Sequence, residues 1–461
     1  MNDAPLMLSV SGLRGIIGQS LTPAVATRYA VSYGNWLKCR DDFDGGPRVV
    51  VGRDSRPSGV MLEQAVVAGL VGVGCHVIRL GVVTTPSTGI MVEALAAAGG
   101  LVLTASHNPG QWNGIKALCD NGAAPSRKQA EQVFDLFHRA EVSTAMVDDL
   151  GSIEEDDTTH RVHVERVVGQ IDRAAIAGRK LKVVLDSGHG AAGPVTAMLL
   201  RELGVELIHL YPEPTGRFPH PPEPLRENLE ELCGQVTAHD ADVGFAQDPD
   251  GDRLVVVDET GRYIGEEYTL ALACRRVLER GASPQIIVTN LSTSRMVDDV
   301  AALWGATVIR TPVGEANVAA AMCNHGASAG GEGNGGVIWP PVVSVRDSLS
   351  GIGLILEMMA SSADLPQSLS SLVNRMPAYA IVKDKVAVSK ELVDRVGQDL
   401  PGHFPEQRVD VQDGVRIDWD DQWIHIRPSN TEPILRLIAE AADTQAATKL
   451  IGRVRAVLGI D

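Results

Sequence analysis

Aromatic residues are scarce in this sequence of 461 residues, because Phe, Trp and Tyr together make up only 4% of it. Hydrophobic residues nevertheless reach 44%, so the core must be built from Val, Leu, Ile and Ala. Cores of this kind are typical of α/β proteins, in which parallel strands are buried on both faces. The length alone suggests about three domains, and the spacing of the motifs described below suggests four.

Long apolar runs are also missing. No uninterrupted apolar stretch reaches the roughly 18 residues that a membrane span needs. Residues 1–5 are not the basic region before an apolar stretch that a secretory signal has. We therefore expect a cytoplasmic protein with no membrane partner. The formal net charge of -17 likewise argues against a nucleic-acid partner.

The six cysteines are scattered, with no Cys-x-x-Cys pair and no histidine at metal-ligand spacing. This arrangement excludes the usual zinc motifs. We expect the cysteines to be small buried residues of a protein from a reducing compartment.

A strand, helix and strand pattern occurs three times, at 48–78, 182–208 and 285–309. In each copy a β-branched run leads through a helical stretch and a glycine into a second apolar run, as in a βαβ unit. Copies about a hundred residues apart predict three α/β domains of similar topology. The acidic stretch 141–160 is predicted to be a boundary, and six prolines within 211–224 predict an extended loop.

Thr104–Lys116, here called the serine loop, follows a short apolar run that is typical of a buried strand. It combines the hydroxyl of Ser106, the imidazole of His107 and the ammonium of Lys116 with glycines that let a backbone approach a ligand. This is the chemistry needed to handle a phosphoryl group. A Ser-His-Asn turn by itself is more often a cap or an Asx turn, so the interpretation depends on the other loops.

Asp248–Arg253, the aspartate loop, lies between two runs predicted to be strands. Asp248, Asp250 and Asp252 alternate with Pro249 and Gly251, so the three carboxylates can converge on one hard cation such as Mg²⁺. A calcium-binding EF-hand is excluded because Arg253 occupies the sixth position, where glycine is required, and because strands flank the loop. An acidic hairpin turn without a metal remains the alternative.

Gly331–Gly336, the glycine loop, matches the dinucleotide-binding pattern by letter. No apolar strand leads into it, however, and no helix follows, so a nucleotide site is excluded. Gly326–Gly330 spells a nucleophile elbow but follows a helical stretch rather than a strand, and is also excluded. The glycines instead expose Glu332 and Asn334, whose side chains hydrogen-bond sugar hydroxyls well. A flexible surface loop is the alternative.

Two further loops carry an arginine. Arg427–Pro433, the C-terminal loop, follows an alternating strand, and its guanidinium, hydroxyl and amide donors suit a phosphate group. Near the N-terminus, Arg14 lies among glycines and apolar residues and needs an anionic partner. An ordinary hairpin and a solvated turn are the respective alternatives.

The serine, aspartate, glycine and C-terminal loops, in this order along the chain, resemble those of the α-D-phosphohexomutases, which move phosphate between C1 and C6 of hexoses. The resemblance covers essentially the whole chain. It implies three topologically similar mixed α/β domains and a smaller C-terminal α+β domain around a central cleft. We expect domain I at 1–155, domain II at 156–260, domain III at 261–376 and domain IV at 377–461.

The resemblance also implies residue roles. Ser106 is expected to be the phosphoserine and to hold Mg²⁺ together with Asp248, Asp250 and Asp252. Lys116 is expected to transfer protons, with His107 as an alternative base, and Arg14 and Arg253 to lie beside the phosphate. The residues expected to bind substrate are Glu332 and Asn334 for the sugar, and Arg427, Ser429, Asn430 and Thr431 for its phosphate.

Charge counting supports this picture. Three aspartates, a phosphoserine of roughly -1.5 to -2 and a similar substrate phosphate sum to about -6 or -7, which one Mg²⁺ cannot balance. Several cations must therefore converge, and Arg14, Lys116, Arg253 and Arg427 stand in the relevant loops.

The expected reaction converts glucosamine 6-phosphate to glucosamine 1-phosphate through a hexose bisphosphate intermediate. The glycine loop resembles the archaeal-type branch of the family, whose members are phosphoglucosamine mutases or phosphomannomutase/phosphoglucomutases, so the second activity is an alternative. A metal-dependent sugar phosphatase and a non-catalytic sugar-phosphate binder are alternatives of other classes. The sequence does not indicate an oligomeric state.

Overall fold

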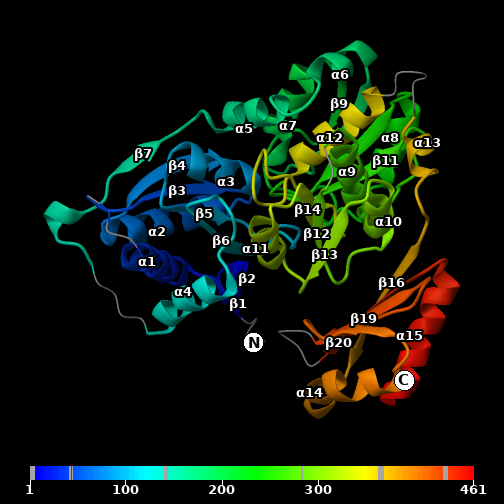
Figure 1. Cartoon of the computed structure of the whole chain (residues 1–461). Coiled ribbons are helices and arrows are strands. Elements are labelled where there is room, and N and C mark those ends of the chain that lie inside the picture. The colour runs from blue at the N-terminus through cyan, green and yellow to red at the C-terminus, as the bar shows by residue number, and fades with distance from the viewer. Residues whose placement is uncertain are drawn as a thin grey trace.

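The computed structural model of the protein describes residues 6–40, 43, 45–139, 144–281, 284–361, 368–428 and 434–460. In these ranges four β-sheets follow one another along the chain, with seven, four, four and five strands. The units built on them follow an arc in Figure 1, from the blue N-terminal unit through green and yellow to the red C-terminal unit. The prediction of three mixed α/β units followed by a different fourth is confirmed.

The first unit is built on a sheet of order β1-β2-β6-β5-β3-β4-β7. Its centre is apolar because Val49, Val50 and Val51 of β3 are fully buried. The strands are β1 (Met7–Ser9), β2 (Gly12–Ile16), β3 (Arg48–Arg53), β4 (His76–Val82), β5 (Gly99–Leu103), β6 (Trp112–Cys119) and β7 (Ile153–Glu155). The helices are α1 (Pro23–Arg40), α2 (Gly59–Gly72), α3 (Thr85–Ala94), α4 (Arg127–Arg139) and the 3-10 helix η1 (Val147–Asp149).

The second and third units each contain a four-stranded sheet covered by helices. The second has β8 (Lys182–Asp186), β9 (Glu206–Leu210), β10 (Val243–Gln247) and β11 (Leu254–Asp258), with α5 (Thr159–Val168), α6 (Arg173–Arg179), α7 (Ala192–Glu202), η2 (Arg226–Asn228) and α8 (Glu230–Ala238). The third has β12 (Ile286–Asn290), β13 (Thr307–Thr311), β14 (Ala329–Glu332) and β15 (Gly336–Ile338), with α9 (Glu266–Arg280), α10 (Met296–Leu303), α11 (Glu315–His325), α12 (Ser348–Ala360) and α13 (Leu369–Val373).

The fourth unit is antiparallel throughout, in the order β16-β20-β19-β18-β17. Its elements are β16 (Ala380–Ala387), α14 (Lys390–Asp399), η3 (Leu400–His403), β17 (Arg408–Asp410), β18 (Val415–Asp418), β19 (Trp423–Pro428), β20 (Ile434–Ala441) and α15 (Thr444–Leu458). None of the helices in the described part of the chain is long and apolar enough to cross a membrane. The expected cytoplasmic location stays a prediction.

The first three sheets share one four-stranded pattern. A first strand (β3, β8 or β12) pairs in parallel with the next strand along the chain (β4, β9 or β13) and with the third (β5, β10 or β14). The third strand then pairs antiparallel with a fourth, β6, β11 or β15. The turn between the third and fourth strands is the serine loop in the first unit, the aspartate loop in the second and the glycine loop in the third. The three loops therefore occupy equivalent places in three copies of one fold.

The glycine loop is more regular than its sequence indicates. We expected no strand before it, yet β14 ends at Glu332 and β15 begins at Gly336. Gly331 has a φ of 148°, and a Cβ there would lie 2.0 Å from the carbonyl oxygen of Gly336. Ala-Gly-Gly-Glu has little strand preference of its own, so the close approach of two backbones and pairing with β12 set this strand.

The hydrophobic core is divided unequally among the units. One cluster of buried side chains is continuous from Val50 and Ile90 in the first unit through Phe245 in the second to Ile352 in the third. The fourth unit has a separate cluster, in which every member lies between 382 and 458. The first three units therefore form one packed body, to which the fourth is joined by other contacts.

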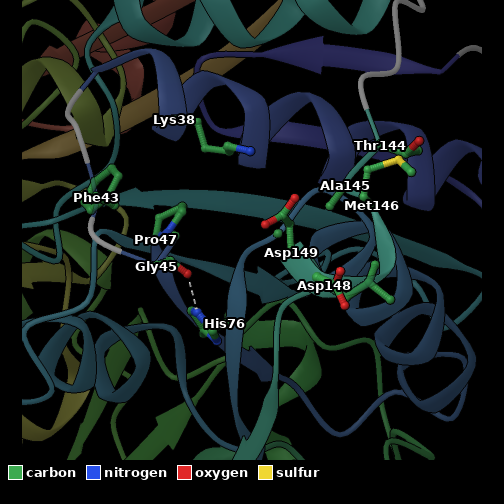
Figure 2. A pocket seen from close by; sticks show the side chains of 13 residues that line it. Lys38, Phe43, Gly45, Pro47, His76, Thr144, Ala145, Met146, Asp148 and Asp149 are labelled. Carbon is green, nitrogen blue, oxygen red and sulfur yellow. Dashed lines mark hydrogen bonds between the residues drawn. The ribbon is translucent and has the colours of Figure 1, made fainter.

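A hollow of about 620 Å³ lies in the first unit between the end of α1, the residues before β3 and β4, and the segment 144–150 (Figure 2). Lys38, Met146 and Asp149 line it, and His76 hydrogen-bonds the Gly45 carbonyl across it at 2.6 Å. Among the lining residues, Pro47 directly precedes β3, Gly74 lies just before β4, and Met146 and Asp149 precede the parallel strand β7, whereas the serine loop follows the parallel strand β5. The hollow therefore lies at the opposite edge of the sheet from the serine loop.

Candidate active site

Ser106 lies in a strained turn directly after β5. Its φ is 49°, in the left-handed region that few residues other than glycine adopt, and its side chain is 1% exposed. Its backbone N–H donates to Thr104 Oγ1 at 2.9 Å, and Thr104 Oγ1 donates to Asp54 Oδ2 at 2.7 Å. A strained backbone conformation persists only where its surroundings fix it. The two hydrogen bonds through Thr104 help to fix the conformation of Ser106.

Arg56 holds the same turn from the other side. It is completely buried, and its Nε donates to Asp54 Oδ2 at 3.0 Å. Its two terminal nitrogens donate to four carbonyl oxygens of the serine loop, those of Ser106, Asn108, Pro109 and Trp112. The five donors of a guanidinium are thus all engaged. The Phe218 ring, from the proline-rich loop of the second unit, lies 5.0 Å from the Arg56 guanidinium.

The aspartate loop meets the serine loop between the first two units. Ser106 Oγ donates to Asp248 Oδ2 at 2.6 Å. Lys116, on β6, donates to Asp250 Oδ2 at 2.7 Å and to Asp252 Oδ2 at 2.9 Å. All three aspartates are fully buried. Thus two loops that lie more than 130 residues apart in sequence form one hydrogen-bonded centre.

The aspartates fit a metal ion in chemistry and in geometry. One oxygen from each lies within 4.8 Å of the others. Among the described residues, Asp250 Oδ1 and Asp252 Oδ1 are buried without a hydrogen-bond partner. A buried carboxylate oxygen without a partner is costly, and a hard cation that prefers oxygen ligands would satisfy it. The centre can therefore hold a divalent cation.

The pKa values of the three carboxyls are driven apart. Burial, followed by repulsion from Asp252 and Asp250, raises the pKa of Asp248 well above its usual range. Burial also acts to raise the pKa of Asp252, but Arg346 and Lys116 lower it well below its usual range. Asp250 has a lowered pKa because Lys116 outweighs burial and the charge of Asp252. Without a cation Asp248 therefore holds a proton more tightly than Asp250 or Asp252 does.

Three further residues named from the sequence lie around Ser106. Arg14 Nη1 donates to Asn108 Oδ1 at 3.2 Å. Arg253 Nε lies 3.9 Å from Asp252 Oδ1, and this nitrogen is buried without a hydrogen-bond partner among the described residues. His107 Nδ1 lies 3.4 Å from Ser106 Oγ, and burial, with Arg253 and Arg14, lowers the pKa of His107 to about 3. The site thus contains two guanidinium groups and a neutral imidazole beside the serine.

Glu332 is buried and Asn334 is half-buried, so neither lies on an open surface loop. Glu332 is 5% exposed, and its oxygens accept hydrogen bonds from several donors. Those donors are Asn290 Nδ2, Gly314 N, Arg346 Nη1 and Asn334 Nδ2. Asn334 Oδ1 accepts from Gly336 N at 3.2 Å. The sugar-binding roles of Glu332 and Asn334 stay predictions, and in this structure both residues stabilise the glycine loop.

Arg427 lies at the end of β19 in the fourth unit, and its Nη2 is 3.2 Å from Asp413 Oδ2. The same Asp413 oxygen accepts from Val313 N of the third unit at 3.0 Å. The structure thus places Arg427 where the fourth unit contacts the third. The remaining predicted phosphate ligands, Ser429, Asn430 and Thr431, lie outside the described residues.

Sequence reasoning missed Arg56, Arg346 and Thr85. Arg346 donates to Asp252 Oδ2 at 2.6 Å, and Thr85 Oγ1 donates to Asp250 Oδ2 at 2.6 Å. Neither Arg346 nor Thr85 lies in a loop with a recognisable motif. Arg346 stands directly before the N-cap of α12, and Thr85 is the first residue of α3. The only signal in the sequence was that each borders a helix start.

Comparison with known proteins agrees with the fold. Sequence profiles described as phosphoglucomutase/phosphomannomutase, alpha/beta/alpha domains I, II and III, match residues 7–143, 161–261 and 265–379. The profile of the C-terminal domain of the same family matches residues 380–457. Together these four matches cover most of the chain in the order of its four sheets.

Individual proteins show the same relationship. A probable phosphoglucosamine mutase of Methanopyrus kandleri is 37% identical over 443 residues, which is 95% of each chain. A phosphoglucomutase/phosphomannomutase of Thermococcus kodakarensis is 37% identical over 446 residues, again 95% of each. The crystal structure of a phosphoglucomutase/phosphomannomutase family protein from Burkholderia thailandensis superposes with a TM-score of 0.85 at 31% identity, covering 98% of both chains. The chain therefore belongs to the phosphoglucomutase/phosphomannomutase family and, as a phosphohexomutase, is an isomerase.

Proposed function

We propose that the enzyme moves a phosphoryl group between C6 and C1 of a hexose by way of Ser106, and that its substrate is glucosamine 6-phosphate. The observation that carries the proposal is the hydrogen bond from Ser106 Oγ to Asp248 Oδ2. This bond places a buried hydroxyl beside a carboxylate cluster that fits a divalent cation. The partners are a hexose phosphate and the hexose bisphosphate formed from it.

The reaction is balanced by two phosphoryl transfers. In the first, the bond between phosphorus and Ser106 Oγ breaks, a hexose hydroxyl forms the new bond, and the hydroxyl proton passes to a base. The resulting bisphosphate reorients, and the bond between its other phosphorus and the hexose oxygen breaks. That phosphoryl group bonds to Ser106 Oγ, the freed hexose oxygen takes a proton back from the base, and the phosphoserine is regenerated. The strained turn suits this role, because it holds Oγ in one position through both transfers.

Asp248, Asp250 and Asp252 hold the metal in this proposal, together with an oxygen on Ser106. All the ligands are oxygens, which favours Mg²⁺. Bound Mg²⁺ would polarise the phosphoryl group and offset its charge. Arg14 is hydrogen-bonded to Asn108 and Arg253 lies beside Asp252, and both are proposed to offer guanidinium groups to the same phosphate.

Lys116 is the proposed proton-transfer residue. Burial lowers its pKa, but Asp250 and Asp252 raise it above its usual value, so Lys116 is an ammonium in the metal-free protein. In that form it donates protons and stabilises negative charge. His107, whose neutral imidazole lies 3.4 Å from Ser106 Oγ, is the alternative base for the hydroxyl proton.

The choice of glucosamine rests on the relatives. The Methanopyrus protein and a second relative, from Methanothermobacter thermautotrophicus and 34% identical, are both named probable phosphoglucosamine mutases. The equally similar Thermococcus protein is named for glucose and mannose phosphates, which makes phosphoglucomutase/phosphomannomutase the second candidate.

The substrate-binding roles follow the predictions from the sequence. Glu332 and Asn334 are proposed to hold the sugar. The phosphate that is not reacting is proposed to be held by the C-terminal loop through Arg427, Ser429, Asn430 and Thr431.

Replacing Ser106 with Ala tests the proposal. Loss of the Oγ removes the group that carries the phosphoryl, so mutase turnover should fall by at least about a thousandfold, as is usual when a nucleophile is removed. Ser55→Ala is a matched control, because Ser55 is a buried serine in a neighbouring turn whose Oγ has no partner among the described residues. Retention of more than a small fraction of the wild-type rate by Ser106→Ala would overturn the assignment.

The substrate is tested by kcat/KM for glucosamine, glucose and mannose 6-phosphates in one assay with Mg²⁺ and a trace of hexose bisphosphate. We expect glucosamine to be preferred. A preference for glucose or mannose would keep the mechanism and replace the substrate. Release of inorganic phosphate without any isomer would instead support a phosphatase.

A further inference from the structure

Arg346 links three carboxylates that come from separate parts of the chain. Its Nη2 donates to Asp252 Oδ2 at 2.6 Å and lies 3.4 Å from Glu315 Oε2, while its Nη1 donates to Glu332 Oε2 at 2.8 Å. The side chain is 8% exposed. One guanidinium thus binds the aspartate loop of the second unit and the glycine loop of the third at the same time.

The path of Arg346 depends on Gly336. A Cβ at position 336 would lie 2.2 Å from Arg346 Cδ and 2.9 Å from its Cγ. Such distances are too short for any real contact, so a side chain at 336 would force Arg346 to move. Gly336 does not have a positive φ, and what requires glycine here is the space that the arginine occupies.

Both ends of the bridge are fixed by other bonds. Glu332 also accepts from Asn290 Nδ2 at 2.8 Å and from Gly314 N at 3.1 Å, which anchor it to the third unit. At the other end, Arg346 and Lys116 share Asp252 Oδ2, which leaves Oδ1 of the same carboxylate buried and without a partner in the described part of the chain. Arg346, together with Lys116, therefore leaves Oδ1 as the oxygen of Asp252 that is free to bind a cation.

We propose that Arg346 is a positioning residue that couples the glycine loop to the metal site, so that the charge and position of Glu332 alter the affinity of Asp252 for a cation. The proposal deepens the phosphohexomutase function given above and rests on it for the meaning of the glycine loop. A reaction that presents first one end of a sugar and then the other needs the sugar-contacting loop and the metal at a fixed separation. A planar guanidinium bonded to both loops supplies that separation, which a lysine cannot.

The coupling is tested without any sugar or turnover, by titrating the protein with Mn²⁺ and measuring free Mn²⁺ by electron paramagnetic resonance. Glu332→Gln removes one of the negative charges that Arg346 now balances. More of the positive charge of Arg346 then acts on Asp252 and opposes the binding of a cation there. We expect Mn²⁺ affinity to fall about fivefold, within the range found for coupled neighbouring residues. In an Arg346→Met background the same Glu332→Gln change should alter Mn²⁺ affinity by less than about twofold.

Equal effects of Glu332→Gln in both backgrounds, or no effect in either, would overturn the coupling. Arg346→Lys is the second variant, for use if Arg346→Met does not fold. Its ammonium keeps the charge but cannot bond both loops in the same way, so the coupling should again be lost. Because the titration needs no catalysis, it stays informative even if the mutase assignment fails.

Turnover separates positioning from simple stabilisation. For Arg346→Lys and for Gly336→Ala, which keeps every charge and displaces the arginine, we expect kcat to fall about a hundredfold with KM changed less than about threefold. Arg276→Lys is the matched control, because Arg276 Nε donates to the buried Glu357 at 2.9 Å away from the site. Its kcat should stay within about twofold of wild type. A lower melting temperature with unchanged kcat in the Arg346 and Gly336 variants would contradict the proposal.

Discussion

Glu267 is a carboxyl group that lies directly behind the glycine loop. Its Oε2 accepts from Ser294 N at 3.0 Å, and both oxygens lie 2.1 Å from the position that a Cβ on Gly333 would occupy. Burial raises the pKa of Glu267 to about 8, although the Ser294 bond acts in the opposite direction. At neutral pH this carboxyl is therefore mostly protonated.

The raised pKa of Glu267 predicts how the stability of the protein changes with pH. A carboxyl whose pKa is higher in the folded protein than in the unfolded chain stabilises the fold fully below the unfolded value, about 4.5. That contribution is lost as the pH rises towards 8. Glu267→Gln should therefore melt about 2–4 °C higher than wild type at pH 8.5, the shift expected for roughly 1 kcal/mol, and close to wild type at pH 5.

Thermal unfolding at the two pH values measures the effect. Glu266→Gln is the neighbouring control, because Glu266 forms an ion pair with Lys383 at 3.3 Å and should not gain stability at high pH. A Glu267→Gln variant that melts with the same difference from wild type at both pH values would contradict the raised pKa.

The hairpin between β5 and β6 is the element that brings Ser106 to the aspartate loop. Arg56 stabilises it through four carbonyl oxygens, and Phe218 from the second unit lies against the guanidinium. The proline-rich stretch had no explanation in the sequence. The contact of Phe218 with Arg56 supplies an explanation. An extended loop can reach from the second unit to Arg56, the residue that holds the serine turn.

We predict that Arg56→Lys lowers kcat about a hundredfold, because an ammonium has three donors and cannot hold four carbonyls and Asp54 together. Steady-state kinetics with the preferred sugar phosphate measures the loss. Arg280→Lys is the control, since Arg280 also donates to a backbone carbonyl, that of Gln170, and to Glu357. Wild-type kcat in Arg56→Lys would show that the serine turn holds its shape without this arginine.

The sequence predicts these hairpins unequally. The three βαβ units and the convergence of three aspartates between two strands were predicted correctly, because runs such as Val49–Val51 and the alternating aspartates are local patterns. β14 was not, because its Ala-Gly-Gly-Glu sequence forms a strand only through neighbouring backbones. Arg56 and Arg346 were missed because the partners that join them to the site, Ser106 and Asp252, lie 50 and 94 residues away in the chain. Long-range contacts of buried charge leave no periodic signal.

At the scale of the whole molecule, the fourth unit is distinct because its hydrophobic core is its own. Polar contacts join it to the third unit. His425 Nδ1 lies 2.8 Å from Ser292 Oγ, Glu440 Oε1 accepts from Arg295 N at 3.1 Å, and Arg416 donates to the Leu291 carbonyl. These partners all belong to the turn between β12 and α10. Polar interfaces between units with separate cores are typical of domains that move relative to one another.

Arg416 is the buried member of this interface, with its guanidinium 4.2 Å from the Trp423 ring and bonded to Asp418. We predict that Arg416→Leu loosens the fourth unit from the third, because the Leu291 carbonyl loses its donor while the separate core remains intact. Small-angle X-ray scattering should show a larger radius of gyration, and KM for the sugar phosphate should rise as Arg427 becomes less well placed. Arg455→Leu, which breaks a pair with Asp384 inside the fourth unit, should leave both quantities unchanged. An unchanged radius and KM in Arg416→Leu would mean that the other polar contacts suffice to hold the fourth unit in place.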